Sequence, residues 1–188
     1  PMPARMAHML VRAAGHGLAG VAAEVAVLLG ERGLGGNDAD LETRRRHWGR
    51  DRGPRAIAAR RMAVNWARLV SDQLDVARDD AVGAAIALGY PDRVARRRDE
   101  SDGAFLMANG RAVRVVGSDA LARTEWLAVA DASGSAEGAR LVAGAALTRA
   151  SVGTLLGDRI SHETSVDYDI QRGSVVAETI EALGAIVL

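Results

Sequence analysis

Residues 105–111 read Phe-Leu-Met-Ala-Asn-Gly-Arg, and a second short apolar run follows at 112–116. Asn-Gly between two such runs is a strong signal for a tight β-hairpin, because both residues accept a positive φ. Three further runs with the composition of strands lie at 125–131, 139–147 and 160–169. Five or six short strands within about 85 residues predict a small OB-like β-barrel.

The first half of the chain has a helical period instead. Apolar residues recur at helical spacing between Gly and Pro breaks in 4–14, 18–32, 54–76 and 80–88, and a short charged helix is expected at 40–48. The 54–76 helix carries an apolar stripe of Met62, Trp66, Leu69 and Leu74, and a polar stripe of Arg61, Asn65, Arg68 and Asp72.

The change of period defines the fold class. We expect an α+β protein in which an N-terminal helical bundle is followed by the small OB-like barrel. A polar run at 98–103 separates the two parts. The expected domains are therefore a helical domain, 1–98, and an OB-like β domain, 99–188, with separate cores.

Composition excludes several kinds of protein. All 24 basic side chains are arginines, so a Walker-type phosphate loop, which needs a lysine, is absent. Cysteine is absent as well, which excludes disulfides, cysteine-ligated zinc and iron–sulfur clusters. Because we find no secretory signal and no apolar stretch of membrane-spanning length, we expect a cytoplasmic protein without a membrane partner. The Pro-Met-Pro start and the apolar run at 183–188 suggest a piece of a longer protein.

No combination of side chains indicates catalysis or metal binding. The four histidines, His8, His16, His47 and His162, are not spaced to converge on a metal ion. We find no G-x-S-x-G motif and no serine set near a histidine base. Asp79-Asp80 stands at the start of a helix, where capping explains it. By itself, the chain is therefore expected to be neither an enzyme nor a cofactor-binding protein.

The arginines are unevenly distributed. Residues 1–98 hold 17 arginines and 11 acids, whereas 99–188 hold 7 arginines and 13 acids. Clustered arginine is the electrostatic signature of phosphate-backbone binding, but a solvated charged face explains such a run equally well. The candidate nucleic-acid-binding residues are Arg44, Arg45, Arg46, Arg60, Arg61, Asn65, Arg68, Arg93, Arg96, Arg97 and Arg98. Within the triplet 96–98, ion pairing with acids of the barrel is the alternative role.

A family resemblance favours the binding interpretation. The stretch Ile86-Ala-Leu-Gly-Tyr-Pro-Asp-Arg-Val-Ala-Arg-Arg-Arg98, followed by the 105–111 segment, resembles the bacterial DEAH-box ATP-dependent helicases of the HrpB family. Segments 3–10, 125–131 and 183–188 agree with the family in order and rough spacing. The resemblance thus covers essentially the whole chain.

The resemblance implies an accessory region. In the family, this region follows two RecA-like motor domains and comprises the end of a winged-helix segment, a helical ratchet (HA2) domain and an OB-like domain. A family-specific C-terminal extension comes next, of which this chain holds at most the beginning. The Walker A motif, the Asp-Glu-x-His box and the arginine fingers lie on the motor domains. No catalytic or ATP-binding residue is therefore carried over, and ATP and Mg²⁺ are implied only for the full-length protein, an ATP-dependent helicase.

Three functions remain open at the level of sequence, and the third of them, an independent hydrolase, requires a metal site or a nucleophile that we do not find. The first is a non-catalytic fragment that helps to hold single-stranded RNA or DNA against the motor domains. The second is a structural or protein-interaction module that docks on the motor domains or on an activator. The acidic barrel is a poor nucleic-acid face, and its stacking candidates are Phe105, Trp126 and Tyr168, of which Trp126 is interpreted as core.

Overall fold

A computed structural model of the chain describes residues 2–98, 103–115, 120–134, 138–169 and 174–188. Helices form the first part: α1 (Ala4–Ala14), α2 (Ala19–Gly30), α3 (Leu41–Arg50), α4 (Pro54–Arg68) and α5 (Ala81–Gly89). Strands follow: β1 (Val94–Arg97), β2 (Ala104–Met107), β3 (Ala112–Arg114), β4 (Trp126–Ser133) and β5 (Ala139–Leu147). The chain continues with α6 (Arg149–Leu156), β6 (Ile160–Asp169), β7 (Ser174–Leu183) and β8 (Ile186–Val187). The α+β class is confirmed.

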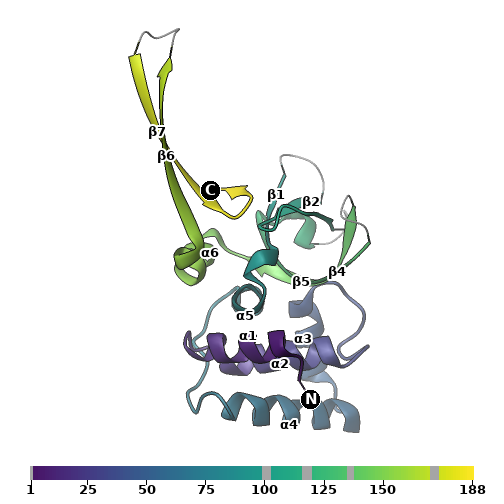
Figure 1. Ribbon diagram of the computed structural model, residues 1–188. Helices are drawn as coiled ribbons and strands as arrows, with labels where there is room; N and C mark the ends of the chain where they lie inside the picture. Colours follow the sequence, from purple (N-terminus) through teal and green to yellow (C-terminus); the bar gives the residue numbers. More distant parts are fainter. Residues whose placement is uncertain (1, 99–102, 116–119, 135–137, 170–173) are drawn as a thin grey trace.

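The helices are stacked in layers below the barrel. Figure 1 shows α4 outermost, α1 and α2 in the next layer, and α5 between these helices and the barrel. Helices α2 and α5 consist mostly of Ala, Val, Leu, Ile and Gly and are buried on nearly all sides. A helix that is apolar all round needs neighbours on every face. Their composition therefore places α2 and α5 at the centre of the bundle.

The barrel is closed and has the strand order β1-β2-β3-β5-β4. Its β2–β3 hairpin turns at Asn109-Gly110, where Gly110 has a φ of 81° and its N–H donates to the Met107 carbonyl over 2.8 Å. The Met107 N–H in turn donates to the Arg111 carbonyl over 2.9 Å, so a three-residue loop ends on a left-handed glycine. The hairpin predicted from this dipeptide is confirmed.

One strand of the barrel was missed, and one was misassigned. β1 lies within the arginine-rich stretch and pairs with both β2 and β4, with Val94 packed toward the helices and Ala95 in the barrel interior. Because β1 is buried on two faces, it lacks the alternation that marks a half-buried strand. The 160–169 strand, expected in the barrel, instead pairs with β7 in a separate sheet of order β6-β7-β8.

Helix α4 ends at Arg68, eight residues before the predicted end at 76. The chain then turns back, and both carboxylate oxygens of Asp75 accept hydrogen bonds from the N–H groups of Gly20 and Val21, at 2.8 and 2.7 Å. Asp75 thereby caps α2, whose own N-cap residue provides no side-chain cap. The expected apolar stripe is wrong at its end, because Leu69 is 81% exposed and Leu74 93% exposed.

The two parts of the chain share a core. One cluster of buried side chains runs from the helices onto the outer face of the barrel, where it includes Trp126, Ala128 and Leu147. The barrel interior forms a second cluster around Phe105 and Leu127. The expectation of fully separate cores is therefore wrong. The domain division at residues 98 and 99 stays a prediction, although β1 lies before it and belongs to the barrel.

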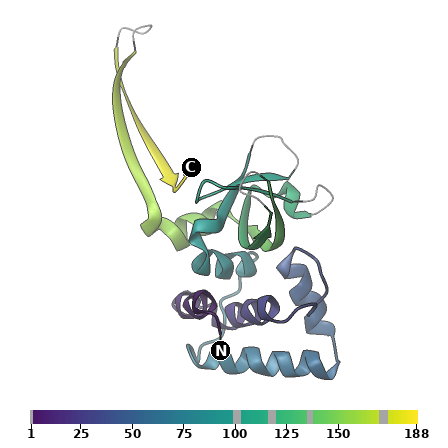
Figure 2. The ribbon, with the colours of Figure 1, turned by 45° about the vertical axis from the view of Figure 1, so that its right-hand side comes forward.

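Strands β6 and β7 form a long two-stranded ribbon. Ten residue pairs join them, from Ile160 opposite Leu183 to Asp169 opposite Ser174. Figures 1 and 2 show the ribbon projecting away from the body, at the end of the molecule opposite α4. A turn expected at 171–173 lies outside the described residues. At the base of the ribbon, Gly184 has a φ of 58°, and the Ala185 N–H donates to the Ala108 carbonyl over 2.8 Å.

Candidate nucleic-acid interface

Arg44 is a structural residue. Its side chain is buried, and its guanidinium donates from Nη2 to the Leu28 carbonyl over 2.8 Å and from Nε to the Leu34 carbonyl over 3.3 Å. Burial lowers the pKa of the guanidinium, but an arginine remains charged in a folded protein. Arg44 thus satisfies carbonyls at the end of α2 and in the following loop, and it does not present its charge to solvent.

The neighbouring arginines are also largely used within the fold. Arg45 forms a hydrogen-bonded ion pair with Glu24 at 2.5 Å, which ties α3 to α2. Arg60 donates to the carbonyls of Trp48 and Asp51, both over 2.7 Å, and so ties α4 to the end of α3. Arg46 is exposed and donates to the hydroxyl of Thr43 over 3.1 Å. Of these three, only Arg46 presents its charge mainly to solvent.

Three arginines of the second cluster, Arg93, Arg96 and Arg97, form hydrogen bonds within the fold. Arg93 donates to the Ala130 carbonyl over 2.8 Å. Arg96 donates to the Val187 carbonyl over 2.7 Å and pairs with Glu125 at 3.5 Å. Arg97 donates to the Arg123 carbonyl over 3.2 Å. The alternative role considered for the triplet 96–98 is therefore confirmed for Arg96.

Arg98 is exposed, as Arg97 is. Its side chain is exposed at the end of β1, and its backbone N–H donates to the Ala104 carbonyl over 2.8 Å. This hydrogen bond extends the β1–β2 pairing by one residue. Arg98 therefore lies at the rim of the barrel sheet.

The outer face of α4 is exposed and accessible to a binding partner. Arg61, Asn65 and Arg68 are exposed, and none has a hydrogen bond or ion pair within the part of the chain that the structure describes. Ile57 and Val64 lie on the same face, because side chains three or four residues apart share one side of a helix; they are 38% and 48% exposed. A groove of about 590 Å³ runs beside α4, with Val64 and Arg68 on its wall. The helix face is basic and apolar, whereas the groove beside it is also lined by the acids Glu24, Asp72 and Asp75.

Two barrel arginines that sequence reasoning missed lie side by side. Arg114 and Arg140 are partners in the parallel pairing of β3 with β5, and both are exposed. Their neighbours Val113 and Leu141 point into the barrel, so the alternation of the strands directs the two guanidinium groups outward. Neither has a side-chain partner among the described residues, and Arg140 lines a groove of about 520 Å³.

Part of the acidity of the second half lies in the β6–β7 ribbon. Five of its 13 acids fall within 160–183, the segment of the β6–β7 ribbon. The alternation around Val113 was readable in the sequence, but the parallel β3–β5 register that joins the two arginines was not. Phe105 and Trp126, at 0% and 1% exposure, are core residues and not stacking platforms, which confirms the interpretation of Trp126. The Tyr168 side chain lies outside the described residues.

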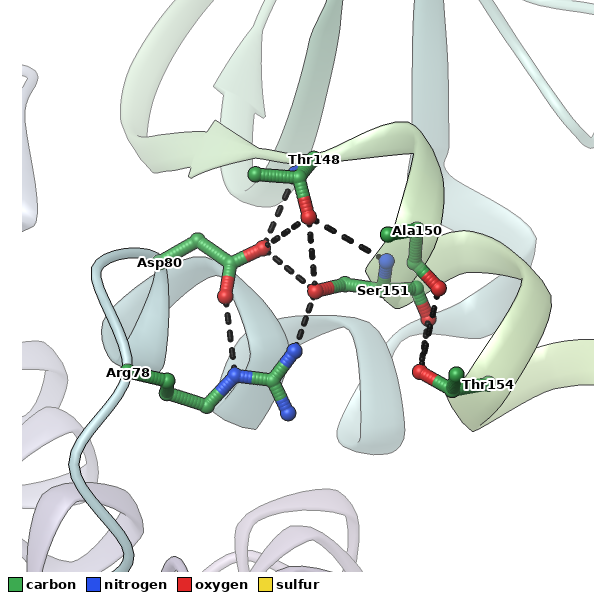
Figure 3. A network of polar contacts seen from close by, with 6 residues as sticks. All are labelled: Arg78, Asp80, Thr148, Ala150, Ser151 and Thr154. Carbon is green, nitrogen blue, oxygen red and sulfur yellow. Dashed lines mark hydrogen bonds and ion pairs between the residues drawn. The ribbon is translucent and has the colours of Figure 1, made fainter.

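The densest polar network is structural (Figure 3). One Asp80 oxygen accepts from Arg78 Nε over 2.8 Å, and the other accepts from the N–H and hydroxyl of Thr148 and from the hydroxyl of Ser151. Arg78 Nη2 also donates to the Ser151 hydroxyl. Burial by itself raises the pKa of Asp80, but the hydrogen bonds from Ser151, Thr148 and Arg78 outweigh it and lower the pKa below its usual value.

This network joins the two halves of the chain. Asp80 is the N-cap residue of α5, yet its carboxylate bonds to Thr148, the N-cap residue of α6. The capping role expected for Asp79-Asp80 is therefore not observed at α5: Asp80 makes no side-chain cap hydrogen bond there, and its carboxylate bonds instead to Thr148, 68 residues away. Among the described residues, no histidine takes part in this network.

Two further features concern metals and membranes. Within the described ranges, no group of three or more His, Asp or Glu side chains is placed to hold a metal ion. No helix among the described residues is long and apolar enough to cross a membrane.

The fold is shared with solved structures of a DExH-box NTPase and of a DEAH/RHA helicase. Both are crystal structures of HrpB from Escherichia coli, with TM-scores of 0.77 and 0.74 and sequence identities of 24% and 23%. Each match covers 98% of this chain but only 22% of HrpB, so the chain spans about a fifth of that protein. No protein-family model and no curated protein matches the sequence significantly. The resemblance read from the sequence is therefore confirmed at the level of the fold.

Proposed function

We propose that this chain is a non-catalytic accessory region of an ATP-dependent helicase that helps to hold single-stranded RNA or DNA against RecA-like motor domains. The observation that supports this proposal is that some of the candidate arginines bond within the fold and others do not. Arg44, Arg60 and Arg93 bond within the fold, whereas Arg61 and Arg68 face solvent along α4. Unused cations along one helix face suit a phosphate backbone, which any sequence provides.

The barrel pair supplies a second contact in this proposal. Arg114 and Arg140 are held on neighbouring strands, about 4.8 Å apart in the sheet, so both guanidinium groups can reach one phosphate or two successive ones. Because arginine binds phosphate through two parallel N–H groups, such a pair positions a strand firmly. In this proposal, ATP and Mg²⁺ bind only to the motor domains of a longer, cytoplasmic protein, and not to this chain.

A specific observation supports the second candidate, a module that docks on protein. Leu69, Leu74 and Val76 are 81%, 93% and 61% exposed at the end of α4 and in the loop that follows. Contiguous exposed apolar side chains mark interaction sites between proteins. In this second function, the α4 end packs on the motor domains, and nucleic acid lies elsewhere.

Replacing Arg61 and Arg68 by alanine tests the first function. Fluorescence anisotropy of a labelled single-stranded oligonucleotide, measured over a salt series, should show weaker binding at low salt. The slope of log K against log salt should fall by roughly two units, one for each lost phosphate contact. Sequence preference should stay the same, because backbone contacts carry no base information.

The matched control removes two exposed arginines elsewhere, Arg12→Ala with Arg159→Ala, which leaves the same net charge. This control should keep the wild-type slope. If the Arg61/Arg68 variant binds as tightly as wild type across the series, α4 does not hold the strand and the protein-docking function is favoured.

A further inference from the structure

One edge of β7 is open along most of its length. Strand β7 pairs with β6 from end to end, but β8 pairs with its other edge only at Ala182 and Leu183. The last hydrogen bond on that edge runs from the Leu188 N–H to the Glu181 carbonyl, over 2.8 Å. In the part of the chain that the structure describes, no strand pairs with this edge from 180 back to 174.

The alternation of the backbone shows which groups face this open edge. Hydrogen bonds of an antiparallel strand point alternately to its two sides. Because the Glu181 carbonyl points to the β8 side, the N–H and C=O groups of Val175, Ala177 and Thr179 point to that side as well. A row of free N–H and C=O groups on an edge strand is a template for another strand. The partner of this edge is therefore an extended polypeptide.

Additional strands would also stabilise the ribbon. A two-stranded ribbon is marginally stable in water, and three or more strands with an apolar face are needed for independent stability. Val166 and Val175 share one face of the ribbon by register and are 63% and 67% exposed. A strand added at the β7 edge widens this apolar face.

A second copy of the chain supplies a strand of the right direction and length. Strand β8 runs antiparallel to β7 on this edge, so a strand that continues its row is antiparallel too. Two β7 strands related by a twofold axis are antiparallel, and 174–180 of one copy then covers 180–174 of the other. In this register, Ala177 lies opposite its own copy and Val175 lies opposite Thr179, so each free backbone group finds a partner.

We propose that the open edge of β7 pairs with the same edge of a second copy, which joins the two ribbons into one four-stranded antiparallel sheet. Such a contact is isologous, because the same residues supply both sides of it. The ribbon lies at the end of the molecule opposite α4 (Figures 1 and 2), so the outer face of α4 stays accessible in the dimer. The pairing does not depend on the proposed function.

Proline substitution at the open edge tests the pairing without nucleic acid. Sedimentation velocity of the wild-type chain over a concentration series should show a reversible dimer. Proline has no N–H, and at Thr179 the missing N–H is one that faces the open edge, so Thr179→Pro leaves the β6–β7 hydrogen bonds in place. By symmetry two hydrogen bonds between the copies are lost, and the Kd of the dimer should rise roughly tenfold to a hundredfold.

Thr164→Pro is the matched control. Thr164 lies directly opposite Thr179, both are exposed, and their hydroxyls are 3.3 Å apart, so the two variants lose the same side-chain contact. The Thr164 N–H faces the outer edge of β6, so this variant should keep the wild-type Kd. A wild-type chain that stays monomeric overturns the proposal. Equal effects of the two prolines, or a larger effect at Thr164, overturn it as well.

A cysteine cross-link tests the register independently of any loss of stability. The chain contains no cysteine, so Ala177→Cys introduces one thiol, directly opposite its own copy. Cα atoms in such a pair are about 5.5 Å apart, which a disulfide can bridge. Mild oxidation should therefore give a covalent dimer of Ala177→Cys, whereas Thr164→Cys, on the other edge, should stay monomeric on a non-reducing gel. If Ala177→Cys does not cross-link, or Thr164→Cys cross-links as readily, the β7 edges are not paired about residue 177.

Discussion

The hairpins β4–β5 and β6–β7 have similar lengths but opposite surroundings. Strand β4 lies between two layers, with Val129 in the barrel interior and Ala128 against the helices, and both are 0% exposed. In the β6–β7 ribbon, Val166 and Val175 are about two-thirds exposed. The strands also differ in composition, because β4 begins with five consecutive buried apolar residues, Trp126 to Ala130, whereas β6 is mostly polar. The valine and alanine side chains of β4 contribute to the buried core, whereas the described valines of the ribbon contribute to the exposed surface.

The largest effect is expected where the body is packed most closely. A Cβ atom at Gly83 in α5 would lie 2.0 Å from the Ala146 carbonyl oxygen of β5. Because that oxygen belongs to backbone, Gly83→Ala forces the helix away from the barrel and should lower the free energy of unfolding by about 3 kcal/mol. Urea titration followed by circular dichroism measures this change.

Gly49 is the matched control for this substitution. It lies inside α3 with no atom within 4 Å of an added Cβ. Gly49→Ala should therefore raise stability by about 0.5–1 kcal/mol, because alanine is the better helix former. If the two substitutions have equal effects, the contact of α5 with β5 is not close.

The second effect concerns the polar junction between the halves. The Asp80 side chain is 8% exposed, and Asp80→Ala removes the acceptor for Arg78, Thr148 and Ser151. We expect a loss of about 2–3 kcal/mol, the usual value for hydrogen bonds to a charged group. Asp79→Ala, which changes the exposed neighbour, should have little effect. A wild-type-like urea midpoint for the Asp80 variant would contradict the role of the network.

The same carboxylate predicts a pH dependence. The pKa of Asp80 is lower in the folded protein than its usual value, so its contribution is fully present above the unfolded pKa of about 3.9. It is lost as the pH falls from that value through the lower folded pKa. The stability difference between wild type and Asp80→Asn should therefore be constant near neutral pH and shrink in acid. A difference that stays constant throughout the acid range would exclude this linkage.

The smallest effect is expected in the ribbon. Val166→Thr with Val175→Thr should change the free energy of unfolding by less than about 0.5 kcal/mol, because exposed substitutions are nearly neutral. The same change in the body, Val129→Thr, places a hydroxyl in the barrel interior and should cost about 2 kcal/mol. Thermal unfolding of the two variants measures the contrast. A large loss from the ribbon variant would mean that its valines are already packed in the free protein.

Local signals in the sequence determined much of the fold. Asn109-Gly110 fixed a hairpin because its turn depends only on adjacent residues. Helix α1 was predicted with the observed bounds, and β5 and β6 were predicted with theirs. The apolar character of α2 likewise placed it in the bundle. These elements follow from neighbours in the chain, whose spacing the sequence shows directly.

Long-range partners decided the rest. The end of α4 depends on Asp75, which caps α2 from 54 residues away, and β1 is a strand only because β2 and β4 lie on either side of it. The exposure of each arginine could not be predicted from the sequence either, since Arg44 is buried while Arg46, two residues later, is exposed. Arg114 and Arg140 became neighbours through a parallel register between strands far apart in sequence. The sequence therefore determined the charges and the local elements. The tertiary structure decided which charges face solvent, because burial and register depend on contacts between segments that are distant in the chain.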